Sequence, residues 1–226
     1  MTGRRFSAER PIRLSDSDAS GRLRHDAIAR FLQDIAADDV LDAGWAPDEH
    51  IWVVRRTVLD VLQPFLTDTA VALTTWCGAV AGSAAARRTS VVGDRGGRVE
   101  AEMIWIHLDA SLQPQRLGDR FLSIYGASAE GRRASTRLVL EGPTDHATVT
   151  TWPLRSTDID QLGHVNNAAY WIAIEERFEL STTHRAVLEY RQPLDLDDTV
   201  ELLQRDDTLW FAVGGEVRAA AALTRS

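Results

Sequence analysis

The chain has 226 residues, of which 44% are hydrophobic and 26% charged, so it can bury a core and is not disordered. Its 25 basic and 33 acidic residues give a formal net charge of −8, which argues against non-specific nucleic-acid binding. The single cysteine, Cys77, cannot form an internal disulfide, and no secretory signal is visible at the N-terminus. Since no apolar run approaches the roughly 18 residues of a membrane span, we expect a cytoplasmic protein.

The first half of the chain reads as one helix followed by several strands. A short strand is predicted over residues 10–14, before a loop of the form Asp-x-Asp-x-x-Gly. Apolar residues then recur at helical spacing, and Gly44 is a plausible end of that helix. Those apolar residues are Ile28, Phe31, Leu32 and Ile35. Strands follow, with a hairpin signal at residues 93–97, and the arginine-rich stretch from Ser128 to His146 reads as a connector.

The second half has the same layout in fewer residues. A strand is predicted over residues 148–155, and the side chain of Asn166 or Asn167 can cap the following helix. Apolar residues then occur every fourth position, and a second hairpin is expected at Gly214-Gly215. The apolar stripe consists of Tyr170, Ile174 and Phe178.

These two halves are copies of one another. The segment from Asp16 to Gly21 recurs 142 residues later, and residues 58–64 recur, as Val187 to Pro193, 129 residues later. We therefore predict an N-terminal domain over residues 1–128, a connector over 129–146 and a C-terminal domain over 147–226. One helix and several antiparallel strands, repeated, give an α+β pattern in which each sheet wraps around its helix. Pairing of the two sheets along their edges would protect the edge strands.

One loop in the second copy carries residues typical of acid–base chemistry. Asp160 and His164 lie four residues apart in a glycine-containing loop that leads into a helix, where an imidazole can activate water. Unpaired backbone N–H groups of Val165 and Asn167 at the helix N-terminus can polarise an acyl carbonyl. Plain turn and capping chemistry is the structural alternative for such a loop. Because the first copy keeps the Asp and Gly residues but lacks this histidine, we place the active site in the second copy.

The full motif resembles the signature of hotdog-fold thioesterases. It runs from Asp158 to Tyr170 and is followed by Glu175-Glu176. The first half resembles the N-terminal hotdog of the acyl-ACP thioesterase family, through residues 15–23, 31–34, 52–56, 74–76 and 101–109. This resemblance implies a double hotdog, with two antiparallel sheets each wrapped around a central helix, in an intramolecular pseudo-dimer. It also implies hydrolysis of long-chain acyl thioesters without a metal or organic cofactor.

Site residues carried over from the family include two departures. Asp160 and His164 match its catalytic Asp and His, but Leu162 stands where the family has Asn, and Asn166 is the candidate to replace that amide. A further polar position of the family falls near Pro193-Leu194, which is apolar here. The first hotdog supplies the acyl pocket in the family, which gives five candidate lining residues. These are Ile28, Phe31, Leu32, Ile35 and Trp52.

The remaining candidates favour structural roles. Cys77 reads as a small apolar residue on a strand, and Glu176 as an acid paired with an arginine. The six histidines show no metal-binding spacing. The arginine pairs could meet an acidic carrier protein or a CoA phosphate, although solvated surface is the simpler explanation. These pairs are Arg55-Arg56, Arg87-Arg88 and Arg132-Arg133.

Two function classes remain open at this point. The first is a thioester hydrolase acting on acyl carrier protein or coenzyme A thioesters of a fatty acid. The second is a non-catalytic acyl-thioester or lipid-binding protein that kept the fold and lost the amide at Leu162. Chain length and carrier are not encoded in these patterns, and a homodimer stays open as the assembly.

Overall fold

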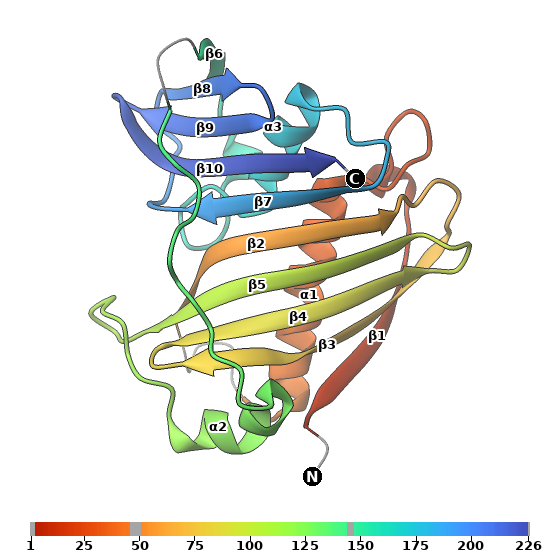
Figure 1. Cartoon of the computed structure of the whole chain (residues 1–226), viewed down its shortest axis with the longest axis vertical. Coiled ribbons are helices and arrows are strands. Elements are labelled where there is room, and N and C mark those ends of the chain that lie inside the picture. Colours follow the sequence, from red (N-terminus) through yellow and green to blue (C-terminus); the bar gives the residue numbers. More distant parts are fainter. Residues whose placement is uncertain (1–2, 46–50, 144–146, 226) are drawn as a thin grey trace.

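The computed structural model describes residues 3–45, 51–143 and 147–225 (Figure 1). The N-terminal half begins with strand β1 and the long helix α1, which are followed by four strands and a short helix. The elements are β1 (Arg5–Pro11), η1 (Leu14–Asp16), α1 (His25–Asp42), β2 (Ile51–Gln63), β3 (Ala70–Ala81), β4 (Ala84–Gly93), β5 (Arg98–Leu108), α2 (Asp119–Tyr125) and η2 (Gly126–Ala129).

The C-terminal half repeats this order with shorter elements. They are β6 (Thr148–Trp152), η3 (Ser156–Asp158), α3 (Ala169–Arg177), β7 (His184–Tyr190), β8 (Val200–Arg205), β9 (Thr208–Val213) and β10 (Glu216–Arg225). Both predicted hairpins are confirmed, since the first connects β4 to β5 and the second connects β9 to β10. Helix α1 ends before Gly44, whose φ of +75° suits glycine at a helix C-terminus.

Both halves share a single antiparallel sheet of ten strands. Its order is β1-β3-β4-β5-β2-β7-β10-β9-β8-β6, so the strands of each half stay together. Strands β2 and β7 join the halves, with a register that runs from Arg56 opposite Glu189 to Val61 opposite His184. The predicted edge-to-edge pairing is therefore confirmed, and it makes one continuous sheet out of the two expected sheets.

Helices α1 and α3 cover one face of this sheet and build a core that crosses the junction. Figure 1 shows α1 lying behind the strands β2 to β5, and α1 also contacts α3. One hydrophobic cluster includes Ile28, Leu32 and Ile35 of α1 together with Trp171 and Ile174 of α3. No helix in the described ranges is both long and apolar enough to cross a membrane.

The connector between the halves lies on the opposite face of the sheet, in front of the strands in Figure 1. The buried carboxylate of Glu189 accepts hydrogen bonds from the backbone N–H groups of Val139 and Leu140, at 2.7 and 3.1 Å. Trp210 donates its indole N–H to the carbonyl of Glu141 at 2.8 Å. These contacts hold the connector in an extended path. The predicted division at residues 128 and 146 stays a prediction.

Candidate active site

The loop before α3 is shaped by its own hydrogen bonds. The backbone N–H of Asp160 donates to the carbonyl of His164 at 2.9 Å, and Gly163 turns the chain with a φ of +84°. The Asp160 carboxylate accepts the N–H of Leu162 at 2.9 Å and the amide of Asn166 at 3.4 Å. Asp160 therefore folds the loop, and Asn166 supplies an amide beside it.

The first copy forms the same loop with the same backbone bonds. Asp18 donates to the carbonyl of Arg22 at 2.8 Å, and Gly21 has a φ of +87°. The carboxylate of Asp18 likewise accepts a backbone N–H two residues on, from Ser20 at 2.9 Å. The shared Asp and Gly residues thus have a structural role in both loops, as expected. By position, His164 replaces Arg22, which makes it the distinguishing residue of the second loop.

His164 has an acidic partner that the sequence alone did not reveal. Its Nδ1 lies 2.6 Å from Oδ1 of Asp195, and the two side chains are 47% and 61% exposed. The pairing arises because the N–H of Val165 donates to the carbonyl of Leu194 at 2.8 Å, which places the following residue beside the histidine. In the described part of the chain no hydrogen bond joins the side chains of Asp160 and His164.

Asp195 changes the interpretation of the second family departure. The apolar Pro193-Leu194 does not leave the site without an acid, because an acid stands at the next position. The signal was available in the acidic run Asp195-Leu-Asp-Asp198, but register along a turn cannot be read from one sequence. A hydrogen bond from the Asp195 backbone N–H to the Asp198 carboxylate, at 2.8 Å, fixes this turn.

The oxyanion prediction for Val165 is wrong, because its backbone N–H is already bound to Leu194 and its side chain is buried. Asn167 differs: its carbonyl accepts the Tyr190 hydroxyl at 3.3 Å, and no described group accepts its backbone N–H. Asn166 forms the turn before α3, since its Oδ1 accepts the N–H of Ala168 at 2.9 Å, while Ala168 itself is the N-cap residue. Asn167 therefore remains a candidate donor to an acyl oxygen at the helix N-terminus.

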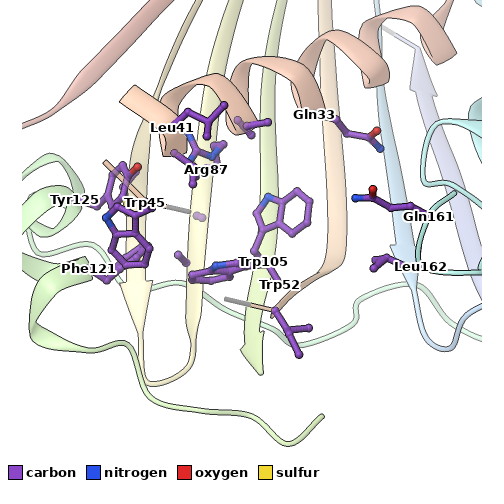
Figure 2. Close-up of a pocket in the computed structure, with 17 residues that line it drawn as sticks. Gln33, Leu41, Trp45, Trp52, Arg87, Trp105, Phe121, Tyr125, Gln161 and Leu162 are labelled. Carbon is purple, nitrogen blue, oxygen red and sulfur yellow. The ribbon is translucent and has the colours of Figure 1, made fainter. Parts of the chain in front are cut away.

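A large apolar pocket adjoins the loop. Its volume is about 790 Å³, and Figure 2 shows Gln161 and Leu162 at one end and Trp45, Phe121 and Tyr125 at the other. It runs along α1, where about 12 Å separates Gln33 from Leu41 at the helical rise per residue. The lining residues are Gln33, Ala36, Ala37, Val40, Leu41, Trp45, Ile51, Trp52, Cys77, Ala85, Ala86, Arg87, Trp105, Phe121, Tyr125, Gln161 and Leu162.

The predicted pocket residues are corrected by this geometry. Trp52 lines the pocket, whereas the other four pack in the core, on a different stripe of α1 from the pocket-lining one. These four are Ile28, Phe31, Leu32 and Ile35. The lining stripe of α1 contains Ala36 and Ala37, whose small side chains leave space. Sequence reasoning missed it because the most apolar stripe of a helix identifies the core, and a cavity needs small residues.

Structural roles were predicted for both Cys77 and Glu176. Cys77 is buried as expected, burial raises the pKa of its thiol, and it lines the pocket wall. In α3 the buried ion pair belongs to Glu175 rather than to Glu176. The Glu175 carboxylate lies 2.8 Å from Nδ1 of His25 and 3.0 Å from the Arg22 guanidinium.

His25 and His184 extend this buried cluster between the halves. The two Nε2 atoms are 2.9 Å apart, and Nδ1 of His184 lies 2.7 Å from the carbonyl of Thr182. Burial lowers the pKa of His184, and the neighbouring His25 and Arg22 lower it further. Among the predicted histidines, His50 and His146 lie outside the described residues.

Comparisons with known proteins agree with this architecture. Residues 3–125 match the family model described as Acyl-ACP thioesterase N-terminal domain, and residues 141–216 match Acyl-ACP thioesterase C-terminal domain. An uncharacterized protein of Mycobacterium tuberculosis is 38% identical over 220 residues, which cover 93% of this chain and 88% of that protein. The chloroplastic oleoyl-acyl carrier protein thioesterase of Coriandrum sativum is 24% identical over 87% of this chain and 63% of that protein.

Solved structures share the fold at low sequence identity. A putative oleoyl thioesterase from Lactobacillus plantarum superposes with a TM-score of 0.81 at 17% identity, covering 98% of this chain and 95% of its own. The 12:0-ACP thioesterase from Umbellularia californica gives 0.79 at 18% identity, with 99% and 97% covered. The predicted double hotdog is thus confirmed for the described residues. Because the N-terminal family model alone covers more than half of the residues, the chain belongs to the acyl-ACP thioesterase family, whose reaction is the hydrolysis of fatty acyl thioesters.

Proposed function

We propose that the His164–Asp195 pair carries out the hydrolysis of a fatty acyl thioester in this protein. The observation that carries the proposal is the position of the pair. His164 lies two residues beyond Leu162, which lines one end of the apolar pocket, so a chain in that pocket would bring its thioester to the loop. The candidate base therefore lies within three residues of the loop residues that form this end of the pocket.

In this mechanism His164 acts as the general base. Asp195 accepts the Nδ1–H of the imidazole, which leaves the lone pair of Nε2 free to take a proton from water. The water oxygen attacks the carbonyl carbon, and the backbone N–H of Asn167 at the start of α3 stabilises the developing oxyanion. Breaking of the C–S bond then returns the proton to the thiolate, so the products are a fatty acid and a thiol.

Asp160 and Asn166 act as positioning residues in this proposal. The Asp160 carboxylate is bound within the loop, and the Asn166 amide lies 3.4 Å from it, near the position where the family has its Asn. Asn166 also accepts a hydrogen bond from Gln33, at 3.3 Å, which connects the loop to the pocket-lining stripe of α1. Loss of either residue should therefore lower kcat more than it raises KM.

We infer that the carrier is acyl carrier protein and that hydrolysis releases a fatty acid from fatty acid biosynthesis. The descriptions of both matching family models and the name of the Coriandrum sativum relative support this carrier. Coenzyme A thioesters are the alternative, and direct comparison of the two carriers separates them.

The test is a thiol-release assay over C8 to C18 acyl-ACP and acyl-CoA. We expect His164→Ala to lower kcat by about a hundredfold or more, since general base catalysis contributes roughly 10² to 10⁴. The control is the thermal unfolding of His164→Ala, which should match that of the wild type because the His164 side chain is 47% exposed. Equal rates for the wild type and His164→Ala on every substrate would refute the mechanism.

A non-catalytic acyl-binding protein is the second candidate, and the departure at Leu162 is the observation that favours it. Leu162 is 68% exposed and cannot donate to Asp160 through its side chain. We expect Leu162→Asn to change turnover less than about threefold, because Asn166 already provides an amide there. A wild type that binds acyl-CoA without turnover, together with a large gain of activity in Leu162→Asn, would establish the second candidate instead.

A further inference from the structure

The catalytic loop receives a hydrogen bond from the other half of the chain. Gln33 lies on α1, in the N-terminal half, and its Nε2 donates to Oδ1 of Asn166 at 3.3 Å. The Gln33 side chain is half-buried and lines the pocket, and Figure 2 shows its amide pointing from the helix toward Gln161 of the loop. Helix α1 therefore contributes a polar group to a site that was predicted in the second copy alone.

The orientations of both amides are fixed by their neighbours. Oδ1 of Asn166 also accepts the backbone N–H of Ala168 at 2.9 Å, and Nδ2 of Asn166 donates to the carboxylate of Asp160 at 3.4 Å. Because an N–H needs an acceptor and a carboxylate needs a donor, the oxygen of Asn166 faces Gln33. Gln33 must then present its NH₂ group to the loop. A continuous set of hydrogen bonds thus connects α1 to Asp160 through Asn166.

The first copy contains the reciprocal contact. Glu175 of α3 follows Gln33 by 142 residues, the same offset that relates the two loops. Its Oε1 lies 3.0 Å from the Arg22 guanidinium and 2.8 Å from Nδ1 of His25, both in the first loop or directly after it. Each long helix thus places the residue at this position against the loop of the opposite half, as expected across a pseudo-twofold interface. The contact belongs to the architecture of the double hotdog.

The residue type at this position matches the loop that it meets. The first loop presents two basic groups, Arg22 and His25, and the opposite helix supplies a carboxylate. The second loop presents the carbonyl oxygen of Asn166 in front of the Asp160 carboxylate, and the opposite helix supplies an amide donor. The first contact is a largely buried ion pair, whereas the second lies on the wall of the pocket. Gln33 therefore serves the loop that faces the acyl chain.

Given the thioesterase function proposed above, we infer that Gln33 is a positioning residue for hydrolysis, supplied by the N-terminal half to the loop of the C-terminal half. Its N–H holds Asn166 in the orientation in which Asn166 donates to Asp160. Asp160 in turn binds the backbone N–H of Leu162, two residues before His164, and so fixes the base relative to the pocket. The active site is composite, and neither half contains all of it.

The test replaces Gln33 with Ala and with the isosteric Glu, and it follows thiol release so that kcat and KM are obtained separately. We expect Gln33→Ala to lower kcat about fivefold, the effect of one neutral hydrogen bond, with KM changed less than about twofold. Gln33→Glu should lower kcat about tenfold or more, because a carboxylate has no proton for Oδ1 of Asn166. The Asn166 amide would have to turn over and lose its hydrogen bonds to Ala168 and Asp160.

Gln63→Ala is the matched control, because it makes the same chemical change on an exposed side chain at the end of β2. It should keep the kcat and KM of the wild type. The Tm of Gln33→Ala should stay close to that of the wild type, since Ala is the better helix former and offsets the lost hydrogen bond. In an Asn166→Ala background, adding Gln33→Ala should change kcat less than about twofold, because the two residues act as one unit.

Three results would overturn the inference: an unchanged kcat in Gln33→Ala, a rise in KM alone, or additive losses in the double variant. Gln33 would then only line the acyl chain or act independently of Asn166. Failure of the proposed function looks different, because the wild type itself would release no thiol and both proposals would fall. If His164→Ala is inactive while Gln33→Ala has the kcat of the wild type, hydrolysis stands and this inference alone is refuted.

Discussion

Replacing Asp195 with Asn tests the central contact of the proposed mechanism while nearly preserving side-chain shape. The 2.6 Å bond between Asp195 and Nδ1 of His164 would lose its negative partner, and the asparagine amide could hold the imidazole in the wrong tautomer. In a fully buried triad this kind of change costs about 10⁴ in kcat. Here both side chains are about half exposed, so solvent screening reduces the effect, and we expect a loss of roughly tenfold to a hundredfold.

The assay follows thiol release at saturating and limiting acyl thioester, so kcat and KM are obtained separately. We expect kcat to fall and KM to change less than about twofold, because Asp195 does not line the acyl pocket. Asp197→Asn is the matched control, since it makes the same chemical change two residues away on an exposed side chain. Equal kcat values for the two variants would refute the role assigned to Asp195.

Three further predictions concern the pocket and the buried charges. Ala85→Phe should narrow the pocket and lower kcat/KM at least tenfold for the longest accepted chain, with the shortest chain unaffected in a substrate panel. The wild-type free energy of unfolding, measured in urea, should fall as pH drops below about 6.5, because burial keeps His184 neutral in the folded state while the unfolded chain takes up the proton. His184→Asn should reduce this dependence of the unfolding free energy on pH. An unchanged pH dependence in this variant would contradict the assignment. Asp39→Asn should lower the free energy of unfolding by about 3 kcal/mol, because Arg4 and Arg87 lose their shared carboxylate. This corresponds to a decrease of roughly 6 to 12 °C in Tm. A decrease of less than about 2 °C in scanning calorimetry would count against a structural ion cluster.

The fold could be predicted because its signals are local and repeated. Gly44 ended α1, the glycine pairs marked both hairpins, and the recurrence of the Asp-x-Asp-x-x-Gly loop revealed two equivalent units. The short helix α2 was missed, although Phe121 and Tyr125 on it close the pocket. Its seven residues are too few to give a clear apolar period.

The candidate site could be assembled from the sequence only where its residues are neighbours along the chain. Asp160, His164 and Asn166 were proposed within one loop, whereas Asp195 lies 31 residues from His164 in sequence and contacts it only in the folded structure. The sequence also could not show which backbone N–H groups stay free, because the hydrogen bond from Val165 to Leu194 depends on tertiary packing. The pocket-lining stripe of α1 was missed for a related reason: alanines signal a cavity only once the surrounding residues are known.

The junction between β2 and β7 has a consequence for building chimeras from members of the family. These strands pair along six positions, and one hydrophobic cluster draws side chains from both halves. If the halves of two family members were exchanged at the connector, β2 of one protein would pair with β7 of the other. The side chains of α1 would then also pack against an α3 from a different protein. A crossover that transplants these four elements as one unit should give a hybrid that folds, because it keeps both the strand junction and the shared hydrophobic cluster intact.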